Sequence, residues 1–125
     1  MKIFKGYKKI KLIHNKLTKW NWVVSYPENL TMGKYIDIGA FTYIQAQNGV
    51  VIEDNVQIGS HSSIYSVSTI DDKKGKVILK KNCKIGTHST IMPNVTIGEN
   101  SIVGAYSFVT KDVPDNVIIY GILRR

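Results

Sequence analysis

The feature that most constrains this chain is a repeat of aliphatic residues with a period of six. With one two-residue gap and one longer loop, the repeat runs through twelve positions: Met32, Ile38, Ile44, Ile52, Ile58, Ile64, Leu79, Ile85, Ile91, Ile97, Val103 and Val109. Met, Ile, Leu and Val together make up 38 of the 125 residues, so chance does not explain an unbroken series. An amphipathic α-helix would place its apolar stripe every 3.6 residues. The period of six therefore excludes a helical fold and indicates a repeat architecture.

The residues between the aliphatic positions complete the repeating unit. Glycine directly follows the aliphatic residue in six of the twelve cases, and the fourth residue after it is usually small or β-branched, as in Ser62, Cys83 and Val95. Alternate side chains of a strand point to the same side, so one large and one small residue face inward. Glycine and asparagine tolerate the positive φ of tight turns. The sequence predicts an all-β fold, a parallel β-helix of about four triangular coils, with one short protruding loop near residues 70–78.

The limits of the repeat divide the chain into three parts. We expect a basic lead-in over 1–28, the β-helix domain over 29–114 and a tail over 115–125. Trp20 and Trp22 in the lead-in are expected to cap the open end of the core. The single cysteine, Cys83, excludes an internal disulfide and fits a reducing cytoplasm. Because it falls on the inward small-residue position, we expect a buried packing thiol and not a nucleophile.

The charge of the chain is strongly basic, with a formal net charge of +8. Lysines gather in two groups: Lys2, Lys5, Lys8, Lys9, Lys11, Lys16 and Lys19 near the N-terminus, and Lys73, Lys74, Lys76, Lys80, Lys81 and Lys84 later. Such groups attract nucleic acid, an anionic membrane or a phosphate-bearing small molecule, or they form a solvated surface. Charge alone does not choose among these. No run of about 18 apolar residues exists, so no membrane span is expected.

One segment resembles a known family. Residues 77–114 read VILKKNCKIGTHSTIMPNVTIGENSIVGAYSFVTKDVP. This segment is similar to the C-terminal signature of the hexapeptide-repeat acyltransferases, in particular the galactoside and xenobiotic O-acetyltransferases and related amino-sugar N-acetyltransferases. The resemblance extends over residues 36–69. It implies a left-handed coil, a cytoplasmic acetyltransferase and a homotrimer. It also implies acetyl-CoA as acyl donor, bound between neighbouring subunits, with no metal and no nucleic-acid partner.

The same resemblance assigns three residues to acetyl-CoA binding. It implies that the backbone N–H of Thr87 faces the thioester carbonyl, that the backbone of Ala105 holds the pantetheine arm, and that Lys111 lies near the CoA phosphates. The chemistry is consistent, since main-chain donors suit an oxyanion. A lysine suits phosphate as a point charge.

Two histidines are candidates for the catalytic base. The O-acetyltransferases carry their catalytic histidine where this chain has Thr69, and their substrate-holding asparagine aligns with Gly39. His61 and His88 occupy the same phase of the repeat, so we expect them at one corner, about one strand spacing apart. An imidazole suits general base catalysis near neutral pH. We expect His61 as the base, with His88 as second candidate. Alternatively, both are simply polar turn residues, since the O-acetyltransferases carry a non-catalytic histidine at the position of His88.

The absence of the family's usual catalytic histidine affects which acceptor group is expected. A neutral amine is already nucleophilic, so loss of the base predicts N-acetylation of a nucleotide-linked amino sugar for surface polysaccharide. The basic charge suits an acceptor with a diphosphate. The alternative is O-acetylation of a sugar, with His61 as the base. A third hypothesis is a zinc β-helix of the carbonic anhydrase kind. Such a site needs three histidine ligands, whereas these repeats contain two histidines.

Overall fold

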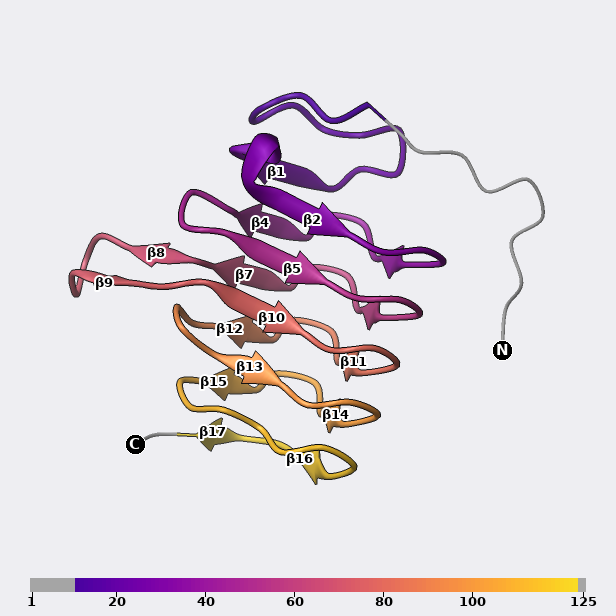
Figure 1. Ribbon diagram of the computed structural model, residues 1–125, viewed down its shortest axis with the longest axis vertical. Helices are drawn as coiled ribbons and strands as arrows, with labels where there is room; N and C mark the ends of the chain where they lie inside the picture. The colour runs from indigo at the N-terminus through magenta and orange to yellow at the C-terminus, as the bar shows by residue number, and fades with distance from the viewer. Residues whose placement is uncertain (1–10, 124–125) are drawn as a thin grey trace.

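Three parallel sheets form the walls of a triangular β-solenoid in the computed structural model, which describes residues 11–123 (Figure 1). Wall 1 contains β1 (Val23–Ser25), β4 (Tyr43–Gln45), β7 (Ser63–Tyr65), β12 (Thr90–Ile91), β15 (Phe108–Val109) and β17 (Ile122–Leu123). Wall 2 contains β2 (Leu30–Met32), β5 (Val50–Ile52), β10 (Val77–Leu79) and β13 (Thr96–Ile97). Wall 3 contains β3 (Asp37–Ile38), β6 (Gln57–Ile58), β11 (Lys84–Ile85), β14 (Ile102–Val103) and β16 (Ile118–Ile119).

The coil is left-handed, as the resemblance implied. Descending from the N-terminal end in Figure 1, the chain crosses the front from left to right along β2 and returns behind along β4. The same path repeats through about five turns. Each strand pairs in parallel with its equivalent one coil away, so that Ile58 lies opposite Ile85 and Ile64 opposite Ile91. The predicted parallel β-helix is therefore confirmed.

The repeated aliphatic residues fill the interior. Eleven of the twelve are buried, and only Met32, in the first coil, is partly exposed. Burying one such side chain stabilises the fold by about 1.5–3 kcal/mol. Cys83 is also fully buried, which confirms its predicted packing role. Burial, with a smaller contribution from Glu53, raises the pKa of its thiol to about 12.

The regular structure extends beyond the expected limits of the repeat at both ends. β1 pairs with β4, so wall 1 begins before the expected boundary at residue 29. Trp22 is 3% exposed and packs in the core, whereas Trp20 is 47% exposed and lies under the Lys19 amine. In the expected tail, β16 and β17 pair with β14 and β15. Main-chain pairing needs no aliphatic period, so the repeat alone did not reveal these strands. Lys2, Lys5, Lys8 and Lys9 lie outside the described residues.

The predicted protruding loop is a β-hairpin. β8 (Val67–Ser68) and β9 (Lys73–Lys74) pair antiparallel and project from the left side of the solenoid in Figure 1. Ile70 at the turn is 99% exposed. The one helical segment described is the short 3₁₀ helix η1 (Pro27–Asn29). Within residues 11–123, no helix has the length and apolar character needed to span a bilayer.

Candidate active site

The corner where wall 3 passes into wall 1 repeats one local sequence in four coils. Each coil has a glycine, a small residue and then a ring: Gly39-Ala40-Phe41, Gly59-Ser60-His61, Gly86-Thr87-His88 and Gly104-Ala105-Tyr106. The four ring residues all have positive φ, between 59° and 64°. Bulky L-residues rarely adopt this conformation. Hydrogen bonds between coils hold it, since the backbone N–H groups of His61 and His88 donate to the carbonyls of Ala40 and Ser60.

Glycine is required at this corner because the coils approach closely there. A Cβ atom at Gly59 would lie 2.5 Å from the nitrogen of Thr87, and one at Gly86 would lie 2.4 Å from the nitrogen of Ala105. Buried hydroxyls brace the same layer, since Ser89 donates to the carbonyl of Gly104 at 3.0 Å. The main chain around Thr87 and Ala105 is thus held in a fixed position.

The four ring residues stack along the corner, and we call them the ring ladder. The centroids of Phe41 and His61 are 5.3 Å apart, those of His61 and His88 4.8 Å, and those of His88 and Tyr106 4.8 Å. All four side chains are exposed. The prediction that His61 and His88 share a corner, one strand spacing apart, is confirmed. Phe41 and Tyr106 were missed, although each occupies the same phase of the repeat.

Hydrogen bonding distinguishes the two histidines. His88 Nδ1 lies 2.9 Å from Thr87 Oγ1, and that hydroxyl donates to the carbonyl of Ser60 at 2.7 Å. Within residues 11–123, the ring of His61 has ring contacts with Phe41 and His88 but no hydrogen bond. Only His88 is therefore oriented by a polar partner.

Main-chain donors at this corner are available to a ligand. In the described part of the chain, the N–H groups of Thr87 and Ala105 donate to no protein acceptor, and the same is true of the equivalent N–H groups of Ala40 and Ser60. Most backbone N–H groups in folded proteins are paired. Of these unpaired donors, those of Thr87 and Ala105 lie in successive coils beside the oriented imidazole of His88, where they can bind a carbonyl or a developing oxyanion.

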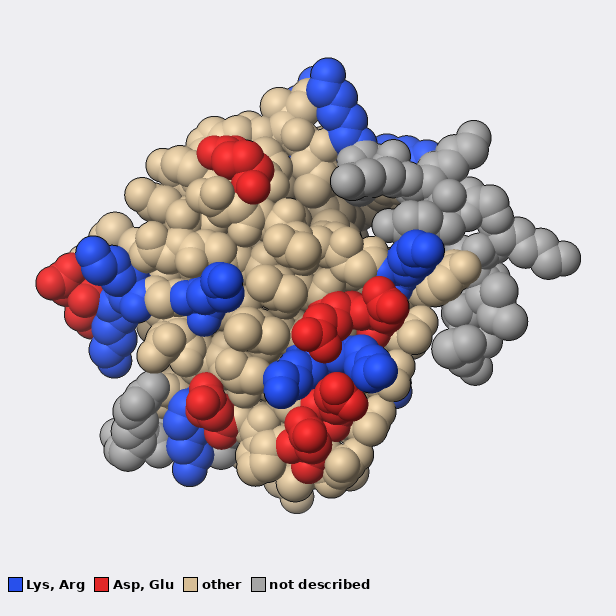
Figure 2. Space-filling model, in the orientation of Figure 1, with Lys and Arg blue, Asp and Glu red and all other residues tan. Residues whose placement is uncertain are grey.

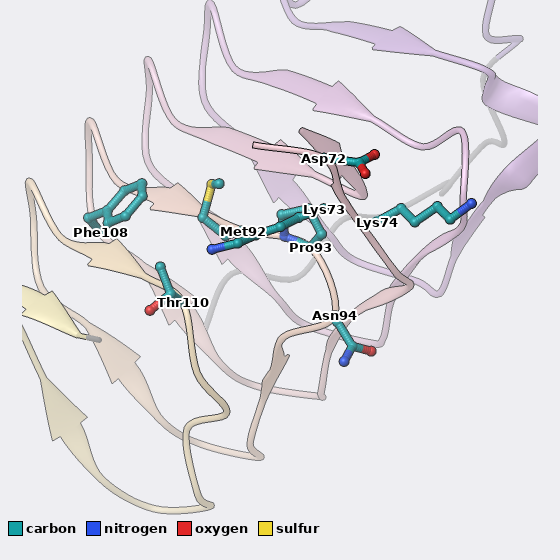
Figure 3. A pocket seen from close by; sticks show the side chains of 8 residues that line it. All are labelled: Asp72, Lys73, Lys74, Met92, Pro93, Asn94, Phe108 and Thr110. Carbon is teal, nitrogen blue, oxygen red and sulfur yellow. The ribbon is translucent and has the colours of Figure 1, made fainter. Parts of the chain in front are cut away.

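A groove lies at the other edge of wall 1, where the hairpin overhangs the coils. It has a volume of about 630 Å³, and its lining consists of Asp72, Lys73, Lys74, Met92, Pro93, Asn94, Phe108 and Thr110 (Figure 3). Met92 and Phe108 supply apolar surface, and Figure 3 shows Lys74 and Asp72 pointing away from them. Lys73 pairs with Asp71 at 3.5 Å. The groove thus combines an apolar wall with a charged rim.

Lys111 follows Thr110 at this edge and is exposed. It makes no ion pair with any residue that the structure describes. Ala105 precedes β15 and Lys111 follows it, so the two lie on opposite sides of wall 1. Six extended residues span at most about 20 Å. The sequence-predicted residues thus form two groups, His61, His88, Thr87 and Ala105 at one corner and Lys111 at the other, and only an elongated ligand can reach both.

Charge at another corner of the solenoid is mixed. Along the corner between walls 2 and 3, carboxylates of Glu53, Asp54 and Asp115 accept backbone N–H groups from neighbouring coils. Figure 2 shows acidic and basic side chains together on this side, so no uniform basic patch covers it. No group of three or more His, Cys, Asp or Glu side chains suited to a metal ion occurs among residues 11–123.

Comparison with known proteins identifies similar chains. Residues 76–111 match the family model described as bacterial transferase hexapeptide (six repeats). The galactoside O-acetyltransferase of Lactococcus lactis subsp. lactis (strain IL1403) is 33% identical in an alignment 104 residues long, and the match covers 71% of this chain and 50% of that protein. This chain therefore spans about half the length of that relative.

Two solved structures are also similar. A mutant of AntD, an N-acyltransferase from Bacillus cereus, solved with dTDP and coenzyme A, superposes with a TM-score of 0.72 and 28% identity, over 85% of this chain and 75% of that one. A maltose O-acetyltransferase from Clostridium difficile 630 gives a TM-score of 0.74 and 27% identity, over 81% of this chain and 59% of that one.

Proposed function

Because this chain belongs to the bacterial hexapeptide-repeat transferase family, we propose that it transfers an acetyl group from acetyl-CoA to a hydroxyl group of a sugar. The observation that carries the proposal is the unpaired N–H of Thr87 beside the oriented ring of His88. The relatives support a hydroxyl acceptor, since galactoside and maltose O-acetyltransferases are among them. The favoured acceptor is therefore a hydroxyl group, which was the alternative hypothesis from the sequence, and not the amine expected there.

The corner supplies the groups that such a reaction needs. Attack on a thioester places negative charge on the carbonyl oxygen, and the N–H of Thr87 donates to that oxygen. A fixed donor of this kind is worth about 3–4 kcal/mol of transition-state stabilisation. The N–H of Ala105, one coil further on, is suited to an amide carbonyl of the pantetheine arm. Lys111, across wall 1, is suited to the phosphates of an elongated CoA molecule.

One histidine can carry the proton through the whole transfer, acting first as base and then as acid. The acceptor oxygen forms a bond to the thioester carbon while its proton moves to the imidazole. The carbon–sulfur bond then breaks, and the imidazolium returns the proton to the leaving thiolate. The products are a sugar acetate and free CoA, and no further reactant is needed.

An amine acceptor is the second candidate, and the similarity to AntD favours it. AntD is an N-acyltransferase whose structure contains dTDP and coenzyme A. The neutral amine of an amino sugar linked to a nucleotide would need no base to attack the thioester, and the proton it then loses would go to the leaving thiolate. The phosphates of the nucleotide would suit the exposed lysines of the hairpin. Deletion of the imidazole base separates the two acceptors, since only the hydroxyl reaction depends on it.

We expect the active form to be a homotrimer. Phe41 and Tyr106 in the ring ladder are 57% and 70% exposed, and Ile118, Tyr120 and Ile122 in the last turn are 67–73% exposed. A neighbouring subunit would cover this apolar surface and close the site. Sedimentation at micromolar concentration should give a trimer. A stable monomer with full activity would contradict a shared site.

The proposal is tested by screening acceptors with acetyl-CoA and following thiol release. The panel pairs each plain glycoside with the corresponding amino sugar and its nucleotide-linked form. We expect turnover with glycosides that contain no amine. Turnover with amino sugars alone would establish the second candidate, and no turnover with any sugar would contradict sugar acetylation.

A further inference from the structure

We infer that the Thr87 hydroxyl fixes His88 in the tautomer with its proton on Nδ1, which makes His88 Nε2 the base. The inference rests on the proposed acetyl transfer and deepens it. It assigns the catalytic role to His88, the second candidate from the sequence, and gives the Thr87 side chain a positioning role. The N–H of the same residue remains the donor to the thioester carbonyl.

The direction of each hydrogen bond follows from counting protons on the Thr87 hydroxyl. A hydroxyl has one proton to donate and two lone pairs. Thr87 Oγ1 is 2.7 Å from the carbonyl oxygen of Ser60, which can only accept, so the single proton of Thr87 is used there. The contact of 2.9 Å with His88 Nδ1 therefore needs a proton on the nitrogen. Ser60 Oγ, at 3.3 Å, donates to the second lone pair.

The tautomer follows from this pattern. With the proton on Nδ1, a neutral His88 has its lone pair on Nε2, the ring nitrogen further from the backbone. Nε2 is thus the nitrogen that can accept a proton from an acceptor hydroxyl. When it does so, Nδ1–H stays bonded to Thr87, and the imidazolium then returns the Nε2 proton to the CoA thiolate. The tautomer of a catalytic histidine is commonly set by the bond at its other nitrogen.

Stacking holds the plane of the His88 ring. His61 lies on one face with 1° between the ring planes, and Tyr106 lies on the other with 7°. Ring rotation would break both contacts, so the ring is held from two sides as well as at Nδ1. Its position next to Thr87 in the chain places the base beside the donor to the thioester carbonyl.

His61 is the internal comparison. It occupies the equivalent position one coil earlier and follows Ser60, which is a hydroxyl residue like Thr87. Yet no hydrogen bond to the His61 ring occurs within residues 11–123, and the Ser60 hydroxyl is directed to Thr87 instead. Its tautomer is therefore not fixed by the protein. Of the two stacked imidazoles, only His88 has a defined base nitrogen.

The test compares the parent protein with Thr87→Val and Thr87→Ser by ¹⁵N NMR of the imidazoles and by steady-state kinetics. Valine keeps the shape and the backbone N–H but removes the hydroxyl, whereas serine restores it. We expect the neutral His88 of the parent and of Thr87→Ser to have its proton on Nδ1. In Thr87→Val the Nε2–H tautomer should gain population. The kcat of Thr87→Val should fall about 10- to 100-fold with little change in the KM for acetyl-CoA, and Thr87→Ser should recover most of the loss.

The NMR readout separates this inference from the proposed function. A parent His88 with its proton on Nε2 would overturn the inference whatever the activity. An unchanged kcat in folded Thr87→Val would overturn it even if the parent acetylates sugars well. A parent that acetylates no sugar would contradict the proposed function and, with it, the role of base, while the tautomer measurement would still test the role of Thr87.

Discussion

The imidazole rings of His61 and His88 lie parallel, with 4.8 Å between centroids and 1° between ring planes. This relationship follows from the stacking of coils, because Ile58 and Ile85 pair directly and each histidine follows its pair by three residues. The spacing matches the strand separation of a β-sheet. The two candidate bases are therefore distinguished by what each bonds to, and not by where they lie.

Replacing each histidine in turn tests which one is the catalytic base. His88→Ala should lower kcat by about 10²–10⁴-fold, because it removes the oriented base. His61→Ala should have a smaller effect, since it removes a stacking partner of His88 only. CoA affinity should stay near the parent value in both. Kinetics with a hydroxyl acceptor measure the difference, after circular dichroism has shown both variants to be folded. A larger loss in His61→Ala would assign the base to His61.

Lys111→Ala tests recognition of the CoA phosphates. We expect the Kd for CoA to rise about 5- to 10-fold, which corresponds to roughly 1 kcal/mol for a lost charge-assisted contact. Lys34→Ala is the matched control, since Lys34 is exposed in the first coil and its backbone N–H bond to Asp54 is retained. Titration calorimetry at low and high salt measures both. Equal CoA affinities of the parent and Lys111→Ala would show that Lys111 does not contribute to CoA binding.

Gly86→Ala tests the close approach of coils at the corner. The added Cβ would lie 2.4 Å from the nitrogen of Ala105, so the backbone must shift. Overpacking of this kind costs about 1–3 kcal/mol of unfolding free energy. Urea unfolding should show this loss, together with weaker CoA binding. Lys34→Ala should unfold like the parent. A Gly86→Ala protein of parental stability would show that the corner is not closely packed.

The raised pKa of the buried Cys83 thiol makes the stability of the fold depend on pH in the alkaline range. Its pKa is about 12 in the folded protein and 9.0 when unperturbed, so the folded state disfavours the thiolate. The resulting stability is fully present below about pH 9 and is lost as pH rises from there towards 12. Unfolding free energies of the parent should therefore fall faster above pH 9 than those of Cys83→Ala. A thiol reagent should modify Cys83 only after unfolding, and rapid modification of the folded protein would contradict its burial.

The six-residue repeat revealed most of the fold, because strands only two or three residues long must bury the equivalent side chain in every coil. It placed Ile58, Ile85 and their equivalents in the core, and it placed both histidines at one corner. It did not reveal β1 or β17, since main-chain pairing continues where the aliphatic period ends. The bond from His88 to Thr87 was also missed, because it depends on side-chain rotamers. Phe41 and Tyr106 were within reach of the same phase argument, but the expected base was an imidazole, which neither a phenyl ring nor a phenol supplies.

Transfer of an isotopic label from the acetyl carbonyl of acetyl-CoA to a galactoside is the most direct measurement of the proposed activity. The product is analysed by mass spectrometry, with free thiol measured in the same samples. We predict one labelled acetyl group on a sugar oxygen for each thiol released, and a much lower rate for His88→Ala. Thiol release without a labelled sugar, or no reaction with any glycoside at saturating acetyl-CoA, would contradict sugar O-acetylation by this protein.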